Sequence, residues 1–293
     1  MAPTLSRAQS HDVAAAAVLT GRHLVTAQDA EAFRALCAVA SAVPLTGAVP
    51  GTVAPAQLAA VALRMCERLL EPEHAPGDRV ALHGTQRLRV ECAAAVGEPL
   101  VSRAEVRSVR PLGAGTATEV AVVFTTDDDT PVAESVSLLV HSPRSAAVPA
   151  PAAARPAVPP AAPVGARCSS YTVTRELVRR YAELSGDHNP IHLSPEAARA
   201  GGFGDLIAHG MLTFALVAHH LAAAVGEAAC ADLQLRFSRP LTVPAEGAAL
   251  TVRDLPAAGG ALAVTAVDGA GLPVAGGRAV LRAPRPDQGR SHD

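Results

Sequence analysis

The sequence contains no lysine, and all 25 of its basic residues are arginine. No lysine side chain can form a Schiff base or hold a phosphate here, so lysine-dependent aldolase, pyridoxal and P-loop chemistries are excluded. Tryptophan is absent and aromatic residues make up 2% of the chain, too few for base-stacking platforms. The formal net charge of −2 attracts neither nucleic acid nor an anionic membrane. We therefore expect neither as a partner.

Other absences concern the compartment and the cofactors. The chain has five scattered cysteines and no C-x-x-C, a pattern that predicts reduced thiols in a cytoplasmic protein. The apolar patch at residues 13–19 is too short for a membrane span and lacks the basic flank of a secretion signal. No G-x-G-x-x-G opens a helix after a strand, which disfavours a dinucleotide cofactor.

The 293 residues, 49% of them hydrophobic, suffice for one large domain or two ordinary ones. Residues 143–167 form a proline- and alanine-rich tract without apolar periodicity, typical of an extended linker. The expected units are residues 1–142 and 168–293. Both units contain an L-R-(V/F) strand start, a loop with Gly and Glu, and a "PVA" turn before a last apolar strand, which indicates duplication of one unit.

Helix signals are clearest in the second unit. Thr174 can cap a helix that Gly186 ends, and Ser194 starts a short helix that stops at Gly201. Residues 211–225 are apolar nearly all round, as in a buried helix. Strand patterns follow at residues 232–239, 248–253, 261–267 and 273–282, and in the first unit residues 30–40 and 55–70 read as helices before further strands. Each unit is therefore predicted to be α+β, with an antiparallel sheet around one helix.

The segment "SGDHNPIH", Ser185 to His192, concentrates groups that can transfer protons or bind a metal. His188 and His192 are four residues apart, as zinc ligands on one helix face often are, but Pro190 disfavours a helix through Asn189. We therefore expect no metal, since other histidines could join only through tertiary contacts. A loop could instead point Asp187 and His192 into one cavity as an acid and base pair. Alternatively, Asp187 only caps a turn and His192 is a surface residue.

Gly210 immediately precedes the predicted buried helix. The first N–H groups of a helix have no partner within it and lie at the positive end of its dipole. They could stabilise a developing enolate oxygen, as an oxyanion hole does. The alternative is that Gly210 only permits close packing.

Residues 181–211, "YAELSGDHNPIHLSPEAARAGGFGDLIAHGM", closely resemble the hydratase motif of MaoC-like (R)-specific enoyl-thioester hydratases and 3-hydroxyacyl-thioester dehydratases. The resemblance rests on D-x-N-P-x-H followed by A-H-G-M, and covers the second half well and the first loosely. It implies a double hot-dog fold, a sheet curled around a long helix in each unit. It also implies catalytic roles for Asp187 and His192, an ordering role for Asn189 and an oxyanion role for Gly210, without metal or cofactor.

The first unit departs from this pattern. Aligning Phe33 with Tyr181 places Val39 at the position of Asp187 and Pro44 at that of His192, so this unit is expected to be catalytically empty and to shape an acyl tunnel. The family often has an aspartate where this chain has Ser194, which caps a helix equally well.

The resemblance implies reversible hydration of 2-enoyl-CoA to (R)-3-hydroxyacyl-CoA. Two alternatives stay open: a dehydratase of acyl-carrier-protein intermediates, and a non-catalytic subunit that binds acyl thioesters. A homodimer is possible. Arg236 and Arg239, which could meet a nucleotide or carrier phosphate, are expected to be strand-surface charges.

Overall fold

The structure, a computed structural model, describes residues 17–41, 48–70, 79–143 and 165–282. The first half of the chain forms β1 (Val18–Leu24), α2 (Ala27–Val39), α3 (Pro55–Leu70), β2 (Arg79–Val90), β3 (Pro99–Leu112), β4 (Gly115–Thr125) and β5 (Pro131–Pro143). The second half forms β6 (Arg167–Val173), α4 (Arg175–Ser185), α5 (Pro190–Leu193), α6 (Pro195–Ala200), α7 (Gly210–Val225), β7 (Cys230–Phe237), β8 (Ala248–Pro256), β9 (Ala261–Asp268) and β10 (Pro273–Leu281). Short 3-10 turns lie at Glu227–Ala229 and Ala258–Gly260.

The predicted helix ends are confirmed. The Thr174 side chain accepts a hydrogen bond from the Leu177 N–H, and Gly186 ends α4 at φ 70°, which glycine adopts readily. The Ser194 side chain caps α6 by accepting from the Ala197 N–H. These local signals fix where the chain leaves α4 and where it enters α6.

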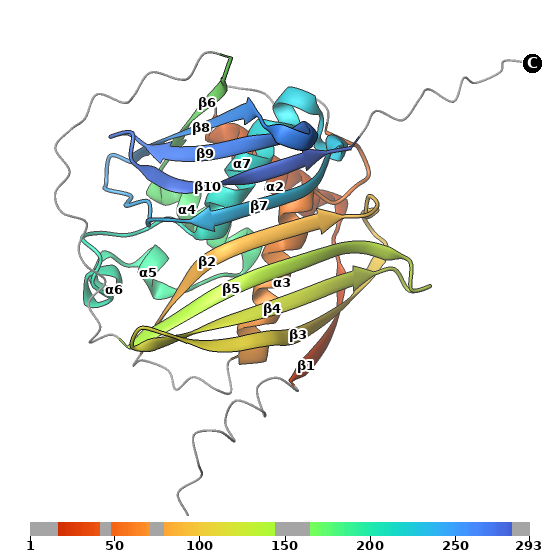
Figure 1. The fold of residues 1–293 in the computed structure, drawn as a ribbon, viewed down its shortest axis with the longest axis horizontal. Coiled ribbons are helices and arrows are strands. Elements are labelled where there is room, and N and C mark those ends of the chain that lie inside the picture. The colour runs from red at the N-terminus through yellow and green to blue at the C-terminus, as the bar shows by residue number, and fades with distance from the viewer. Residues whose placement is uncertain (1–16, 42–47, 71–78, 144–164, 283–293) are drawn as a thin grey trace, which may run out of the picture.

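The ten strands of the described residues form one antiparallel sheet in the order β1-β3-β4-β5-β2-β7-β10-β9-β8-β6. The strand order of the second half mirrors that of the first, and the halves join where β2 pairs with β7, with Thr85 opposite Arg236. Figure 1 shows α3 behind the strands of the first half and α7 behind those of the second. The predicted double hot-dog fold is confirmed.

The two long helices α3 and α7 supply the centre of one hydrophobic core that spans both halves. Leu212, Phe214 and Leu216 of α7 are fully buried, as the all-round apolar pattern predicts. A smaller cluster of Ile191, Ala198, Phe203 and Ile207 fixes the segment between α4 and α7. Among the described residues, no helix combines the length and the apolar character that crossing a lipid bilayer requires.

The predicted linker lies mostly outside the described residues. Its first residue, Pro143, closes β5, and its last, Arg167, opens β6. The division into units 1–142 and 168–293 stays a prediction, although each half has the same order of strands and long helices.

Candidate active site

The loop after α4 is shaped by its own side chains. Asp187 Oδ1 accepts a hydrogen bond from the Asn189 N–H at 3.1 Å, and Asn189 Oδ1 accepts one from the Ile191 N–H at 3.4 Å. Pro190 then starts α5, where its missing N–H costs nothing. The loop buries Asp187 and His192 and leaves His188 exposed. His188 and His192 therefore share no helix face, as Pro190 predicts.

Asp187 and His192 lie together inside the protein, at 6% and 8% exposure. One side-chain atom of each and one of His209 lie within 4.8 Å of one another. His192 Nδ1 lies 2.9 Å from the Ile207 carbonyl oxygen, which can only accept, so Nδ1 carries the proton. The other nitrogen, Nε2, then has a lone pair that can accept a proton. Asp187 does cap a turn, but its burial beside a histidine exceeds what capping requires.

His209 is a member of this cluster that sequence reasoning missed. Its Nε2–H donates to the Asp187 backbone carbonyl at 3.0 Å, and its ring lies over that of His192, with centroids 3.9 Å apart. The ring also contacts Tyr181 of α4. His209 therefore ties the Asp187 loop to the start of α7. The A-H-G-M element was the available signal, but spacing alone could not bring its histidine to residue 187.

Burial keeps both histidines neutral near pH 7. It lowers the pKa of His192 and lowers that of His209 to about 3, while the Asp187 charge opposes the shift in both. His192 thus meets a substrate with an unprotonated Nε2.

Gly210 is the first residue of α7, and Met211 follows it. The N–H groups of Leu212 and Thr213 both point to the His209 carbonyl oxygen, at 3.1 and 3.3 Å. Within the described part of the chain, the Gly210 N–H has no hydrogen-bond acceptor, so it is available to a ligand at the positive end of the helix dipole.

Asp187, Asn189, His192 and Gly210 line one cavity of about 610 Å³, to which both halves of the chain contribute residues. The first half contributes residues from α3, β2 and β5, which are Leu63, Glu67, Leu70, Ala81, Leu82, His83, Gly84, Leu139, Val140 and His141. The first half therefore forms part of the wall of a cavity whose candidate residues Asp187, Asn189, His192 and Gly210 come from the second half.

The expectation for Arg239 is wrong. Arg236 is exposed on β7, but β7 ends at Phe237, so Arg239 follows the loop inward, lines the cavity and pairs with Asp268. A cation at the cavity wall is a candidate contact for a phosphate-bearing substrate.

Asp187, His192 and His209 are also the one group of possible metal ligands found among the described residues. His192 Nδ1 and His209 Nε2 are already engaged with carbonyl oxygens, which leaves one free nitrogen on each ring. That a metal is not needed stays a prediction.

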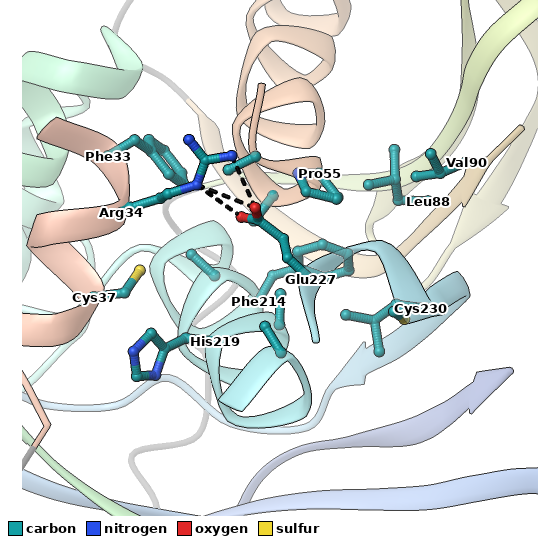
Figure 2. Close-up of a pocket in the computed structure, with 16 residues that line it drawn as sticks. Phe33, Arg34, Cys37, Pro55, Leu88, Val90, Phe214, His219, Glu227 and Cys230 are labelled. Carbon is teal, nitrogen blue, oxygen red and sulfur yellow. Dashed lines mark hydrogen bonds and ion pairs between the residues drawn. The ribbon is translucent and has the colours of Figure 1, made fainter. Parts of the chain in front are cut away.

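A second cavity of about 50 Å³ lies at the start of α3, the counterpart of α7. Figure 2 shows Arg34 and Glu227 joined by hydrogen bonds across it. Pro55 begins α3, where Gly210 begins α7, and proline has no N–H to offer an oxyanion. Val39, aligned with Asp187, is 70% exposed at the end of α2, and Pro44 lies outside the described residues. The described part of the first half therefore offers no second set of catalytic groups.

Acid should destabilise this protein between about pH 7 and pH 5. Burial lowers the pKa of His83 to about 4 and that of His209 to about 3, against about 6.5 in an unfolded chain. Unfolding then takes up protons, so the free energy of unfolding is highest above about pH 7 and falls as the pH drops through 6.5, by about 2 kcal/mol for each of the two histidines. Urea unfolding at both pH values measures the difference.

His83→Phe should shrink that pH difference by about 2 kcal/mol, because it removes one of the buried histidines that take up a proton on unfolding. Equal or greater stability at pH 5 than at pH 7 in the parent protein would contradict the prediction.

The fold and the cavity together define a double hot-dog protein with a buried carboxylate and a buried imidazole in one cavity, which the start of a central helix also lines. A family model described as MaoC like domain matches residues 159–254, which include every site residue named above from the second half except Arg239's partner Asp268. The chain belongs to the MaoC-like family.

Curated relatives match parts of the chain. The 3-hydroxyacyl-thioester dehydratase X of Mycobacterium tuberculosis is 41% identical over 91 residues, which are 31% of this chain and 30% of that protein. A UPF0336 protein of Clavibacter michiganensis is 34% identical over 118 residues, 36% of this chain and 79% of the relative. The mitochondrial 3-hydroxyacyl-[acyl-carrier-protein] dehydratase of Arabidopsis thaliana is 35% identical over 68 residues, 23% of this chain and 41% of that protein. The match thus spans under a third of the length of the first of these relatives.

Solved structures resemble the chain over most of its length. A MaoC-like dehydratase superposes with a TM-score of 0.74 at 20% identity, covering 92% of this chain and 98% of the other. HtdX of Mycobacterium tuberculosis superposes with a TM-score of 0.69 at 22% identity, covering 91% and 100%. At these identities the likeness establishes the fold alone.

Proposed function

We propose that this protein catalyses reversible hydration of 2-enoyl thioesters and dehydration of (R)-3-hydroxyacyl thioesters. The observation that carries the proposal is the convergence of Asp187, His192 and Gly210 on one cavity. Membership of the MaoC-like family and relatives named as 3-hydroxyacyl-thioester dehydratases support it.

In the hydration direction, one water molecule lies between Asp187 and His192. Its two O–H bonds point to the Asp187 carboxylate and to His192 Nε2, both of which accept hydrogen bonds. The water oxygen adds to carbon 3 of the enoyl group, and one of its protons passes through this pair to carbon 2. The reverse path removes the proton from carbon 2 and expels water from carbon 3. Which residue acts as acid and which as base stays open.

Gly210 acts on the other end of the reacting group. Addition at carbon 3 moves negative charge onto the thioester carbonyl oxygen, and the Gly210 N–H at the start of α7 stabilises that charge. Asn189 keeps the Asp187 loop in shape through its cap on α5. No metal or organic cofactor takes part in these steps.

Loss of the conjugated enoyl absorbance tests the proposal. With purified protein and a short or a medium-chain 2-enoyl-CoA, we expect turnover, with the medium chain preferred because leucines of both α3 and β5 line the cavity. Activity should persist after a chelator, since no step uses a metal. Loss of activity on chelation would contradict the metal-free mechanism.

The carrier of the acyl group needs a separate assay. A relative named for acyl-carrier-protein substrates favours a second candidate, a dehydratase of carrier-bound 3-hydroxyacyl groups. Turnover with carrier-bound but not CoA-bound substrates would support it. Binding of both without turnover would support an acyl-binding subunit instead.

A further inference from the structure

His83 is a histidine of the first half of the chain that lines the cavity, as His141 of β5 also does. It lies on β2, next to the seam with β7, and lines the cavity together with Asp187 and Gly210. A methyl group built on Gly210 would lie 3.5 Å from His83 Cβ. The His83 ring contacts Phe237 of β7, with centroids 5.0 Å apart. His83 therefore adjoins the start of α7.

The two ring nitrogens of His83 have no hydrogen-bond partner among the described residues, although both are buried. Burial lowers the pKa of His83 to about 4. The nearby Thr85 backbone and Gln86 side chain favour the charged ring, but their effect is smaller than that of burial. A buried nitrogen without a hydrogen-bond partner is unfavourable, because it has lost its bonds to water. A group that occupies the cavity would remove that cost.

The Gly210 N–H is the one donor assigned so far to the thioester carbonyl oxygen. Asp187 and His192 supply hydrogen-bond acceptors, which suit water and protons, and Gly210 supplies one N–H for the carbonyl oxygen. Oxyanion holes commonly combine more than one donor, and side chains can serve beside backbone N–H groups. A neutral imidazole carries one N–H, which can donate a hydrogen bond.

We propose that His83 is a catalytic residue that donates a hydrogen bond to the thioester carbonyl oxygen beside the Gly210 N–H. This rests on the proposed function, because it requires an acyl thioester in the cavity. With this role for His83, the first half of the chain would contribute a catalytic group in addition to residues that line the cavity. The competing interpretation is a histidine that only fills space against Phe237.

Kinetics of His83 variants separate these interpretations. His83→Phe keeps an aromatic ring beside Phe237 but removes the N–H, so kcat for 2-enoyl-CoA hydration should fall about 10²-fold with KM changed little. His83→Gln keeps an N–H donor and should stay within about tenfold of the parent. His23→Gln is the matched control, because His23 is a half-buried histidine of the same half that hydrogen-bonds Ser102 away from the cavity. It should leave kcat unchanged.

A spectroscopic measurement reports the contact itself. The Asp187→Asn variant, which is expected to turn over slowly, is loaded with 2-enoyl-CoA carrying a ¹³C-labelled carbonyl. The infrared stretching frequency of that carbonyl is compared with that of the free thioester. We expect a shift to lower frequency that shrinks when His83→Phe is added and is regained with His83→Gln. A role limited to packing would not move this frequency, even if His83→Phe lowered stability.

The outcomes separate this proposal from the proposed function. If the parent hydrates enoyl-CoA while His83→Phe keeps kcat within twofold and leaves the infrared shift unchanged, the role of His83 is overturned and the hydratase stands. If the parent turns over no enoyl thioester but polarises the bound carbonyl through His83, the contact stands and the hydratase falls. Failure to bind any enoyl thioester overturns both.

Discussion

Replacing Asp187 by asparagine is expected to lower kcat for 2-enoyl thioester hydration by about 10²–10⁴-fold. The asparagine keeps an oxygen that can accept from the Asn189 N–H, the bond that shapes the loop at 3.1 Å, so the fold of the loop should persist. It loses the carboxylate that accepts and returns a proton. The change therefore removes proton transfer with little change in structure.

His192→Ala is expected to lower kcat over the same range. It removes the only nitrogen lone pair that the Ile207 hydrogen bond leaves on this ring. Because the two residues hold one water molecule together, the double variant should lose little more than either single one. Initial rates of enoyl absorbance loss, with thermal unfolding as a check on folding, measure all three proteins.

The control for both variants is His188→Ala. His188 lies in the same loop, next to Asp187, but its side chain is exposed. Its replacement should keep kcat within about twofold of the parent. If the Asp187 and His192 variants retain parental kcat while turnover is real, the reaction is carried by other groups and the proposed mechanism is wrong.

Sequence patterns predicted the elements well where the signal is local. Thr174, Gly186 and Ser194 set helix ends through side-chain and backbone preferences that act within a few residues. Because α7 is apolar on nearly all sides, its sequence predicts a buried helix whatever elements surround it. The D-x-N-P-x-H loop likewise shapes itself through bonds between near neighbours, so the inward placement of Asp187 and His192 could be anticipated.

Contacts between the halves could not be anticipated in the same way. His83 reaches the cavity because β2 pairs with β7, and no spacing in the sequence encodes that pairing. His209 reaches the Asp187 carbonyl across 22 residues, and Arg239 turns inward only because β7 ends before it. Each of these positions depends on tertiary structure that joins segments far apart in the chain.

Glu227→Ala is expected to lower the free energy of unfolding by about 3–5 kcal/mol. Glu227 accepts hydrogen bonds from Arg34 Nε at 3.1 Å and Arg34 Nη2 at 2.8 Å, with side-chain exposures of 9% and 13%. Removing the carboxylate leaves a buried guanidinium whose charge is uncompensated. For a chain of this size the midpoint of thermal unfolding should fall by about 10 °C.

Arg34→Met combined with Glu227→Leu should recover most of this loss, because the pair is then replaced by apolar groups of similar size and no charge is stranded. The exposed pair Glu176 and Arg179 of α4, at 61% and 60% exposure, provides the control, and Glu176→Gln should change stability by under about 1 kcal/mol.

Since the ion pair of Arg34 and Glu227 lies in the smaller cavity at the start of α3 (Figure 2), enoyl hydration by the folded Glu227→Ala protein should match the parent. A fall in kcat without a fall in stability would mean that this second cavity takes part in catalysis, against the one-site mechanism proposed here.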